Sequence, residues 1–269
     1  MWKNALAVIV LVFFVAACGN DAAPIISDGG TADTDTDTDT DADGDTDADS
    51  DTDADTDTDS DTDVIPGELI GTIRDFHDTH PDFEAELGAE TGIVEDVLGS
   101  DGKPVYAGGA GTVTTHGEAA FDQWYNDTVD VNMSTSWTIQ LVEGTDGVWV
   151  FDDQEFFPID GMLFGEEGNP HNYHFTYELH TQFTYNGGEV FRFTGDDDLW
   201  VFINNRLAID LGGVHGQLTQ EADLDDQAAD LGITTGNVYT LDFFFAERHT
   251  VASHFRIDTT ISDLAPPID

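Results

Sequence analysis

The sequence predicts an all-β fold, a β-sandwich or barrel with a few short helices, and three observations indicate it. Apolar and polar residues alternate with a period of two in several segments, most clearly over 171–185. Glycine-rich turns separate these segments, and stretches with a helical period are few. Outside a low-complexity acidic tract, about 200 residues remain, which is enough for one domain with a proper core.

The N-terminus has the features of an exported, lipid-anchored bacterial protein. Lys3 precedes an apolar run over 5–17 that is too short for a permanent membrane span. The run ends in Val15-Ala16-Ala17-Cys18, which resembles a lipobox, and Cys18 is the only cysteine of the chain. We therefore expect residues 1–18 to be a lipoprotein signal peptide with Cys18 lipidated, although a plain secretory signal stays open. The lipid would be the only membrane contact, at the outer membrane or cell surface.

Residues 19–63 are predicted to be a disordered acidic linker rich in Asp and Thr. Asp occupies every odd position from Asp33 to Asp63, so the tract has little to bury and repels itself. A calcium-binding repeat is the alternative, because Asp41, Asp43 and Asp45 lie around Gly44 as in DxDGD loops. The tract lacks the terminal bidentate Glu of an EF-hand loop.

Residues 64–269 are predicted to form the globular domain, mostly from strands. In segment 171–185 the aromatic residues share one face, and His174, Glu178 and His180 lie on the other, which we expect to be solvated. The segments 137–142 and 147–151 are interpreted as a hairpin. A turn into a short helix that begins at Pro81 is expected over 80–84, and a helical turn is expected at 121–125. The other expected strands are 71–77, 189–194, 199–203, 207–211, 239–245 and 255–261.

The organising segment of the domain is an acidic loop at Asp196, Asp197 and Asp198, which lies between two apolar strands. Adjacent carboxylates repel each other unless something neutralises them, and a hard cation such as Ca²⁺ does so with six to eight oxygen ligands. Exposed aspartates that only solvate the loop are the alternative. Leu199 to Ile203 is apolar at every position, which predicts a strand covered on both faces, with Trp200 in the core. Asn204 and Asn205 suit a tight turn with positive φ.

The formal net charge of −49 argues against binding of nucleic acid or of anionic lipid surfaces. It is compatible with divalent cations and with neutral partners such as sugars. The sequence has no GxSxG elbow and no Gly-rich phosphate loop. On one strand His174 and His180 would stand about 20 Å apart, too far to share a metal. We therefore expect no enzyme, although the sequence leaves open a glycosidase with paired carboxylates.

A set of motifs in a fixed order resembles the fibro-slime domain of bacterial surface proteins and slime-mould extracellular proteins. The resemblance covers roughly residues 68–262. The segments that carry it are 75–76, 80–84, 92–94, 101–106, 121–125, 156–161, 171–176, 195–204, 210–216 and 243–249.

Fibro-slime domains are similar to the PA14 domain, a β-sandwich found in adhesins, glycosidases and toxins. In the lectin-type members, two adjacent aspartates joined by a cis peptide bond hold Ca²⁺, which in turn holds sugar hydroxyls. The resemblance implies that Asp196 and Asp197 are this pair. Further ligands come from the loop between the last two strands, where the lectins have Asn and this chain has Glu247.

We thus expect a lipid-anchored PA14-like domain that binds a glycan or an extracellular matrix component in a Ca²⁺-dependent manner. The expected metal ligands are Asp196, Asp197, Asp198 and Glu247, and the residues expected to contact the bound ligand are Asn204, His215, Arg248 and His249. A self-associating matrix protein, in which Ca²⁺ only stiffens loops, is the alternative. A less favoured one is an accessory to a glycoside-processing enzyme.

Overall fold

The computed structural model describes residues 66–267, and every structural statement below concerns that part of the chain. The predicted signal peptide, the lipidation of Cys18 and the acidic linker lie outside the described residues. In the described part, no helix is long and apolar enough to cross a membrane.

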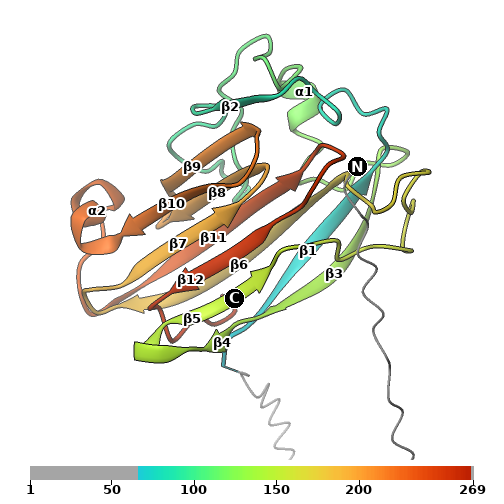
Figure 1. Ribbon diagram of the computed structural model, residues 1–269. Helices are drawn as coiled ribbons and strands as arrows, with labels where there is room; N and C mark the ends of the chain where they lie inside the picture. Colours follow the sequence, from blue (N-terminus) through green and yellow to red (C-terminus); the bar gives the residue numbers. More distant parts are fainter. Residues whose placement is uncertain (1–65, 268–269) are drawn as a thin grey trace, which may run out of the picture. The chain divides into compact units, whose positions relative to one another are not determined.

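The domain is all-β, as predicted, with two sheets, two short α-helices and one short 3-10 helix (Thr145–Gly147) among the described residues (Figure 1). The seven-stranded sheet has the order β2-β9-β8-β11-β6-β1-β3, and the five-stranded sheet has the order β10-β7-β12-β5-β4. All pairings between these strands are antiparallel. The strands are β1 (Glu68–Phe76), β2 (Gly88–Glu90), β3 (Asn132–Gln140), β4 (Val142–Glu143), β5 (Trp149–Asp153), β6 (Phe175–Tyr185), β7 (Val190–Gly195), β8 (Asp198–Ile203), β9 (Arg206–Val214), β10 (Leu218–Asp223), β11 (Asn237–Glu247) and β12 (Phe255–Thr259), and the helices are α1 (Glu118–Phe121) and α2 (Leu224–Leu231).

The main core lies between the two sheets. Alternate residues of β6 and β11 point into it, because side chains of a strand alternate between its faces. Phe243 of β11 packs against Phe193 of β7 and Phe255 of β12, with ring centroids 5.8 and 5.4 Å apart. These contacts join the seven-stranded sheet to the five-stranded sheet across the sandwich.

A second cluster covers the outer face of the seven-stranded sheet. The irregular segment over 91–131, here called the cap, contains α1 and packs Phe121 and Trp124 onto Trp200 of β8 and Phe244 of β11. Trp200 is fully buried, and its indole Nε1 donates to Asp210 at 3.0 Å. Strand β8 is therefore covered on both faces, as its unbroken apolar sequence predicted.

Asn204 and Asn205 form the predicted tight turn between β8 and β9, with φ of 52° and 61°. The predicted hairpin of 137–142 with 147–151 is wrong, since β3 pairs with β1 in the seven-stranded sheet. Only Val142 and Glu143, as β4, pair with β5 in the five-stranded sheet. The chain changes sheets between β3 and β4, and strand periodicity carries no information about such a crossing.

The prediction that His174, Glu178 and His180 form a solvated face is wrong for His174 and Glu178, whereas the His180 side chain is 37% exposed. His174 and Glu178 are 3% and 5% exposed. His174 Nε2 bonds Glu84 at 2.9 Å, and Glu178 accepts from Lys103 of the cap. The alternating sequence of an amphipathic strand is the same whether its polar face contacts water or polar side chains of a second layer.

Two smaller differences concern helices. The segment 80–84 forms turns rather than a short helix, while α2 was not predicted. Asp223 caps α2 by accepting from the backbone N–H groups of Asp225 and Asp226, and Gly232 ends it in the left-handed conformation. These two capping residues are the signal that could have located α2.

Candidate functional site

Asp196 and Asp197 form a connection between β7 and β8, which belong to different sheets. The pair therefore lies where the chain passes from one layer of the sandwich to the other. The peptide bond that joins the two residues is cis, which is the geometry that the resemblance implied. The two side chains are 5% and 4% exposed.

Asp198 begins β8 and is neutralised by an arginine. Arg248 Nε donates to Asp198 Oδ2 at 2.5 Å, Nη2 donates to Oδ1 at 3.1 Å, and the backbone N–H of Gly213 donates to Oδ1 at 2.5 Å. Both oxygens of Asp198 thus have protein partners. The expectation that a cation neutralises all three aspartates of the acidic loop is therefore wrong for Asp198. We leave Asp198 out of the proposed ligand set.

Arg248 was expected to contact the bound ligand, and the structure contradicts this. It is fully buried, and its Nη1 donates to the carbonyl oxygens of Thr114 and Asp82 at 2.6 and 3.0 Å. Its guanidinium also lies over the Trp124 ring, 4.7 Å from the centroid. Arg248 therefore holds the cap and the acidic loop together from inside.

Backbone and imidazole N–H groups fix the orientation of Asp196 and Asp197. Asp196 Oδ1 accepts from the backbone N–H of His254 at 2.5 Å, and its Oδ2 accepts from His254 Nδ1 at 2.9 Å. Asp197 accepts from the backbone N–H groups of His215 and Arg248, at 2.9 and 3.1 Å. His254 was not predicted, although it lies in the loop between the last two strands from which the resemblance drew ligands.

Glu247 ends β11 and is 1% exposed. Its Oε1 accepts from the backbone N–H of His249 at 3.4 Å, while its buried Oε2, like the nearby hydroxyl of Ser253, has no well-formed hydrogen bond among the described residues. Burial, together with the charges of Asp197 and Asp196, raises the pKa of Glu247 well above its usual range. Burial likewise raises the pKa of Asp197 to about 8. A proton or a cation must therefore accompany these carboxylates near neutral pH.

The donor set fits a hard cation, because the unpartnered buried oxygen of Glu247 lies near two oriented carboxylates. Residues 66–267 contain no group of three or more His, Cys, Asp or Glu side chains that already converge as a metal cluster. A bound ion would need further oxygens from backbone carbonyls, water or a ligand.

A hollow of about 320 Å³ opens beside the aspartate pair. Its wall includes His215 and His249, two of the residues predicted to contact a ligand, and also His254. Asn204, the fourth predicted contact, is not there. It lies at the other end of β8, where its Nδ2 donates to the carbonyl of Leu231 at 2.9 Å, and a strand of this length puts about 20 Å between the two ends.

The relatives found among known proteins are much longer than this chain. Protein psiR of Dictyostelium discoideum is 40% identical over 208 residues, which are 71% of this chain and 20% of that protein. Protein psiQ and protein psiD of the same organism are 39% and 38% identical, over 68% and 72% of this chain and 20% and 41% of those proteins. The chain thus spans from a fifth to two fifths of these relatives.

Among solved structures, a PA14 sugar-binding domain from an RTX adhesin shares 11% identity at a TM-score of 0.33 over 71% of this chain and 89% of that chain. A β-glucosidase from Kluyveromyces marxianus shares 18% identity at a TM-score of 0.25, over 40% of this chain and 12% of that chain. The PA14 domain family matches residues 164–267, which run from before β6 through β12 and include Asp196, Asp197 and Glu247. On this match, the chain contains a PA14 domain.

Proposed function

We propose that this domain binds carbohydrate through a Ca²⁺ ion held by Asp196, Asp197 and Glu247. The observation that carries the proposal is the unpartnered, buried Oε2 of Glu247 close to two oriented carboxylates at the edge of an open hollow. Supporting it is the match of residues 164–267 to the PA14 domain.

The protein residues supply orientation and charge. His254 and the backbone N–H of His215 hold the aspartates, so their remaining lone pairs are available to a metal ion. A Ca²⁺ ion would supply open coordination positions for two neighbouring hydroxyl groups of a sugar. Leu87 and Val251, exposed by 70% and 78%, line the same hollow and offer apolar surface to the C–H face of a sugar ring.

The proposed role is binding rather than catalysis. The two aspartates accept hydrogen bonds from fixed backbone N–H groups, which hold their carboxylate oxygens in place for a metal ion. A glycoside substrate assayed in the presence of Ca²⁺ tests this role directly. Measurable turnover that is lost in Asp197→Asn would replace the binding role with an enzymatic one.

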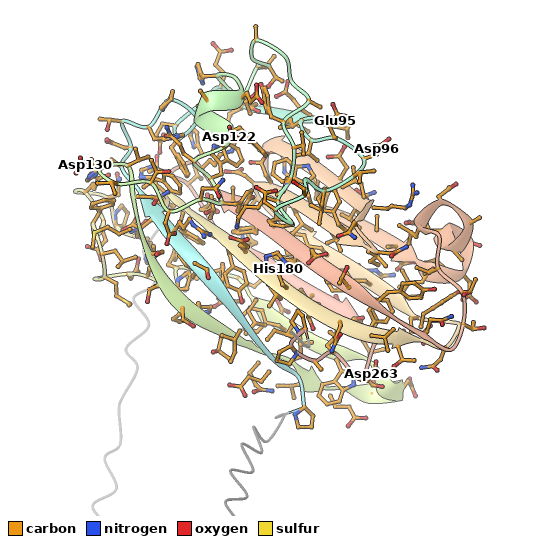
Figure 2. All side chains as sticks on the ribbon, turned by 180° about the vertical axis from the view of Figure 1, so that it is seen from behind. Glu95, Asp96, Asp122, Asp130, His180 and Asp263 are labelled. Atoms are coloured by element: carbon orange, nitrogen blue, oxygen red, sulfur yellow. The ribbon has the colours of Figure 1, made fainter. Side chains whose placement is uncertain are left out.

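Calorimetric titration of Ca²⁺ into chelator-treated protein tests the metal site. Asp197→Asn should raise the Kd for Ca²⁺ at least about tenfold, because it removes one charged ligand. The matched control is Asp130→Asn, an exposed aspartate in the loop before β3 (Figure 2). The same acidic linker is present in both variants, so any binding by the linker cancels. Equal affinities in the two variants would remove Asp197 from the site.

Binding to a glycan array with and without chelator then separates the functions. Ca²⁺-dependent binding to particular glycans supports the lectin-like role. Stabilisation by Ca²⁺ without binding to any glycan or matrix component would instead support the alternative of a self-associating structural protein.

The proposal extends to the location of the protein at a cell surface through a lipid on Cys18. The support is the Val15-Ala16-Ala17-Cys18 sequence, and Cys18→Ala should release the protein from the membrane fraction. Retention of that variant in membranes would contradict the lipid anchor.

A further inference from the structure

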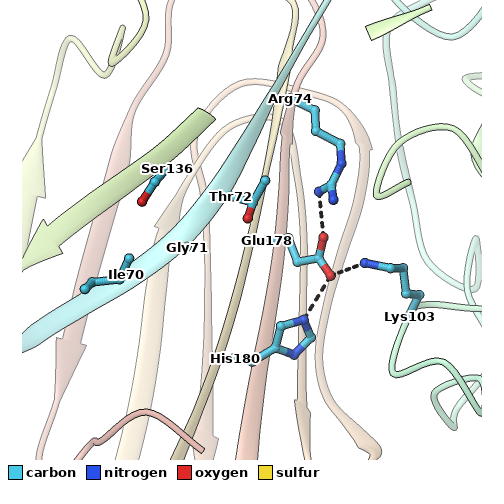
Figure 3. Close-up of a pocket in the computed structure, with 8 residues that line it drawn as sticks. All are labelled: Ile70, Gly71, Thr72, Arg74, Lys103, Ser136, Glu178 and His180. Carbon is cyan, nitrogen blue, oxygen red and sulfur yellow. Dashed lines mark hydrogen bonds and ion pairs between the residues drawn. The ribbon is translucent and has the colours of Figure 1, made fainter. Parts of the chain in front are cut away.

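A second hollow, of about 400 Å³, lies on the outer face of the seven-stranded sheet beside the cap. Figure 3 shows its wall, which is built from β1, β3, β6 and one cap residue. It is separate from the aspartate pair, because no residue lines both hollows. The lining residues are Ile70, Gly71, Thr72, Arg74, Lys103, Ser136, Glu178 and His180.

The lining brings three cationic side chains, Arg74, Lys103 and His180, together around one carboxylate, while Asp127 and Asp242 pair with two of these cations from outside the lining. Glu178 is its one carboxylate, and it accepts from Arg74 Nη1 at 2.6 Å, from His180 Nε2 at 2.9 Å and from Lys103 Nζ. The other ring nitrogen of His180 bonds Asp242 at 2.7 Å. Both nitrogens of His180 therefore donate to carboxylates, which makes the ring a cation. Consistent with this, hydrogen bonds to Asp242 and Glu178 outweigh burial and raise the pKa of His180 to about 9.

Such a group of cationic side chains is unusual for this molecule. The whole chain has 7 lysines and arginines against 56 aspartates and glutamates, and two of those seven line this hollow. Figure 2 shows His180 near the middle of the sheet, with acidic residues of the cap such as Asp122 above it. An anion meets repulsion over most of the surface, so the cationic donors gathered here give this hollow a distinct ligand chemistry.

The hollow also offers neutral hydrogen-bonding groups. Thr72 of β1 and Ser136 of β3 are directly opposite each other in the strand register, and both line the hollow. Within the described residues, neither hydroxyl makes a hydrogen bond to protein, and neither does Nη2 of Arg74. Arg74 is held in place by Asp127 at 2.9 Å and by Glu178, and its side chain is 8% exposed. The guanidinium of Arg74 is therefore oriented before any ligand arrives.

We propose that this hollow binds a carboxylate-bearing sugar, a hexuronate unit of an acidic polysaccharide. The carboxylate lies against Lys103 and the free Nη2 of Arg74, and the ring hydroxyls bond Thr72 and Ser136. The volume of about 400 Å³ falls in the range of small-ligand sites and is ample for one such unit. The site needs no metal, so it stands independently of the calcium site proposed above.

The test is calorimetry of the full chain in the presence of chelator and at low ionic strength, with galacturonate and glucuronate as probes. Galactose and glucose are the neutral counterparts, and acetate supplies a carboxylate without a sugar. We expect at least one of the two uronates to bind, with neutral sugars and acetate at least about tenfold weaker, and binding should weaken as salt is added. Failure of both uronates to bind, or equal binding of a neutral sugar or of acetate, would overturn the proposal.

Variants locate the binding. Lys103→Gln keeps most of the side chain and removes its charge, and Ser136→Ala removes one hydroxyl. Each should raise the Kd for the uronate, about tenfold for Lys103→Gln. The matched control is Arg256→Gln, which removes one positive charge from β12 in the five-stranded sheet, where Arg256 pairs with Asp152 and Asp258. Thermal melting confirms that the variants remain folded.

Asp197→Asn distinguishes the two proposed sites. It should leave uronate binding unchanged, whatever it does to Ca²⁺ affinity. If Asp197→Asn abolishes uronate binding, or if Lys103→Gln and Ser136→Ala bind as tightly as the Arg256→Gln control, the ligand is not in this hollow and the proposal is wrong.

Discussion

Arg248 and Asp198 form an ion pair in which both side chains are fully buried, at the point where the acidic loop meets the cap. The pair lies one residue away from each of the two proposed calcium ligands that flank it, Asp197 and Glu247. It therefore positions the site without belonging to it.

Removal of the Arg248 side chain should strongly destabilise the fold. Arg248→Met leaves the Asp198 carboxylate buried without a partner and takes a donor from the Thr114 carbonyl. Such a loss costs about 3–5 kcal/mol of unfolding free energy. Urea denaturation measures it, and Arg256→Met, at a half-exposed pair, is the control. A loss below about 1 kcal/mol would show that the pair does not hold the cap.

Glu247→Gln should act in opposite directions with and without calcium. The buried carboxylate is costly when no cation is present, so the neutral amide should raise the melting temperature in chelator. The same change should reduce the stabilisation by Ca²⁺, which for a site filled at a hundred times its Kd is about 2.7 kcal/mol. Differential scanning calorimetry in chelator and in calcium measures both. An unchanged calcium response would exclude Glu247 as a ligand.

His180 should make stability depend on pH in the alkaline range. Its pKa is raised to about 9 in the folded state by its hydrogen bonds to Asp242 and Glu178, against about 6.5 when unfolded. The stabilising contribution is therefore complete below pH 6.5 and is lost as the pH rises through 9. His180→Gln should flatten the stability profile between these values. A profile identical to that of the parent protein would show that the ring is not held as a cation.

Gly213 should tolerate no side chain. It has φ of +97°, and a Cβ there would meet the carbonyl oxygen of Gly88 at 2.1 Å, in the strand pairing of β9 with β2. Gly213→Ala should cost more than about 1 kcal/mol and loosen β2, because L-residues avoid this conformation and the contact is with backbone. Gly216→Ala, where a Cβ meets open space, is the control. Hydrogen exchange at Glu90 and Val214 measures the loosening of β2.

Local patterns predicted most of the long strands but missed β2 and β10. They succeed where the period of two and the turn residues act within a few positions. The turn at Asn204 and the double coverage of β8 are examples. What the patterns could not predict depends on partners far along the chain. The burial of Glu178 comes from Lys103, and the neutralisation of Asp198 comes from Arg248. For the same reason, two adjacent residues that were both expected to contact the ligand lie in different places: His249 lines the hollow, and Arg248 is buried in the interior.

The cap has a practical consequence for anyone who isolates the domain. The family match begins at residue 164, whereas the cap, β1 and β3 all precede it. A fragment that begins at that boundary would lack the cap over Trp200, Phe202 and Phe244. It would expose a buried aromatic layer as an apolar patch that promotes aggregation. The shortest piece that stays soluble should therefore begin near residue 66, about a hundred residues before the family match.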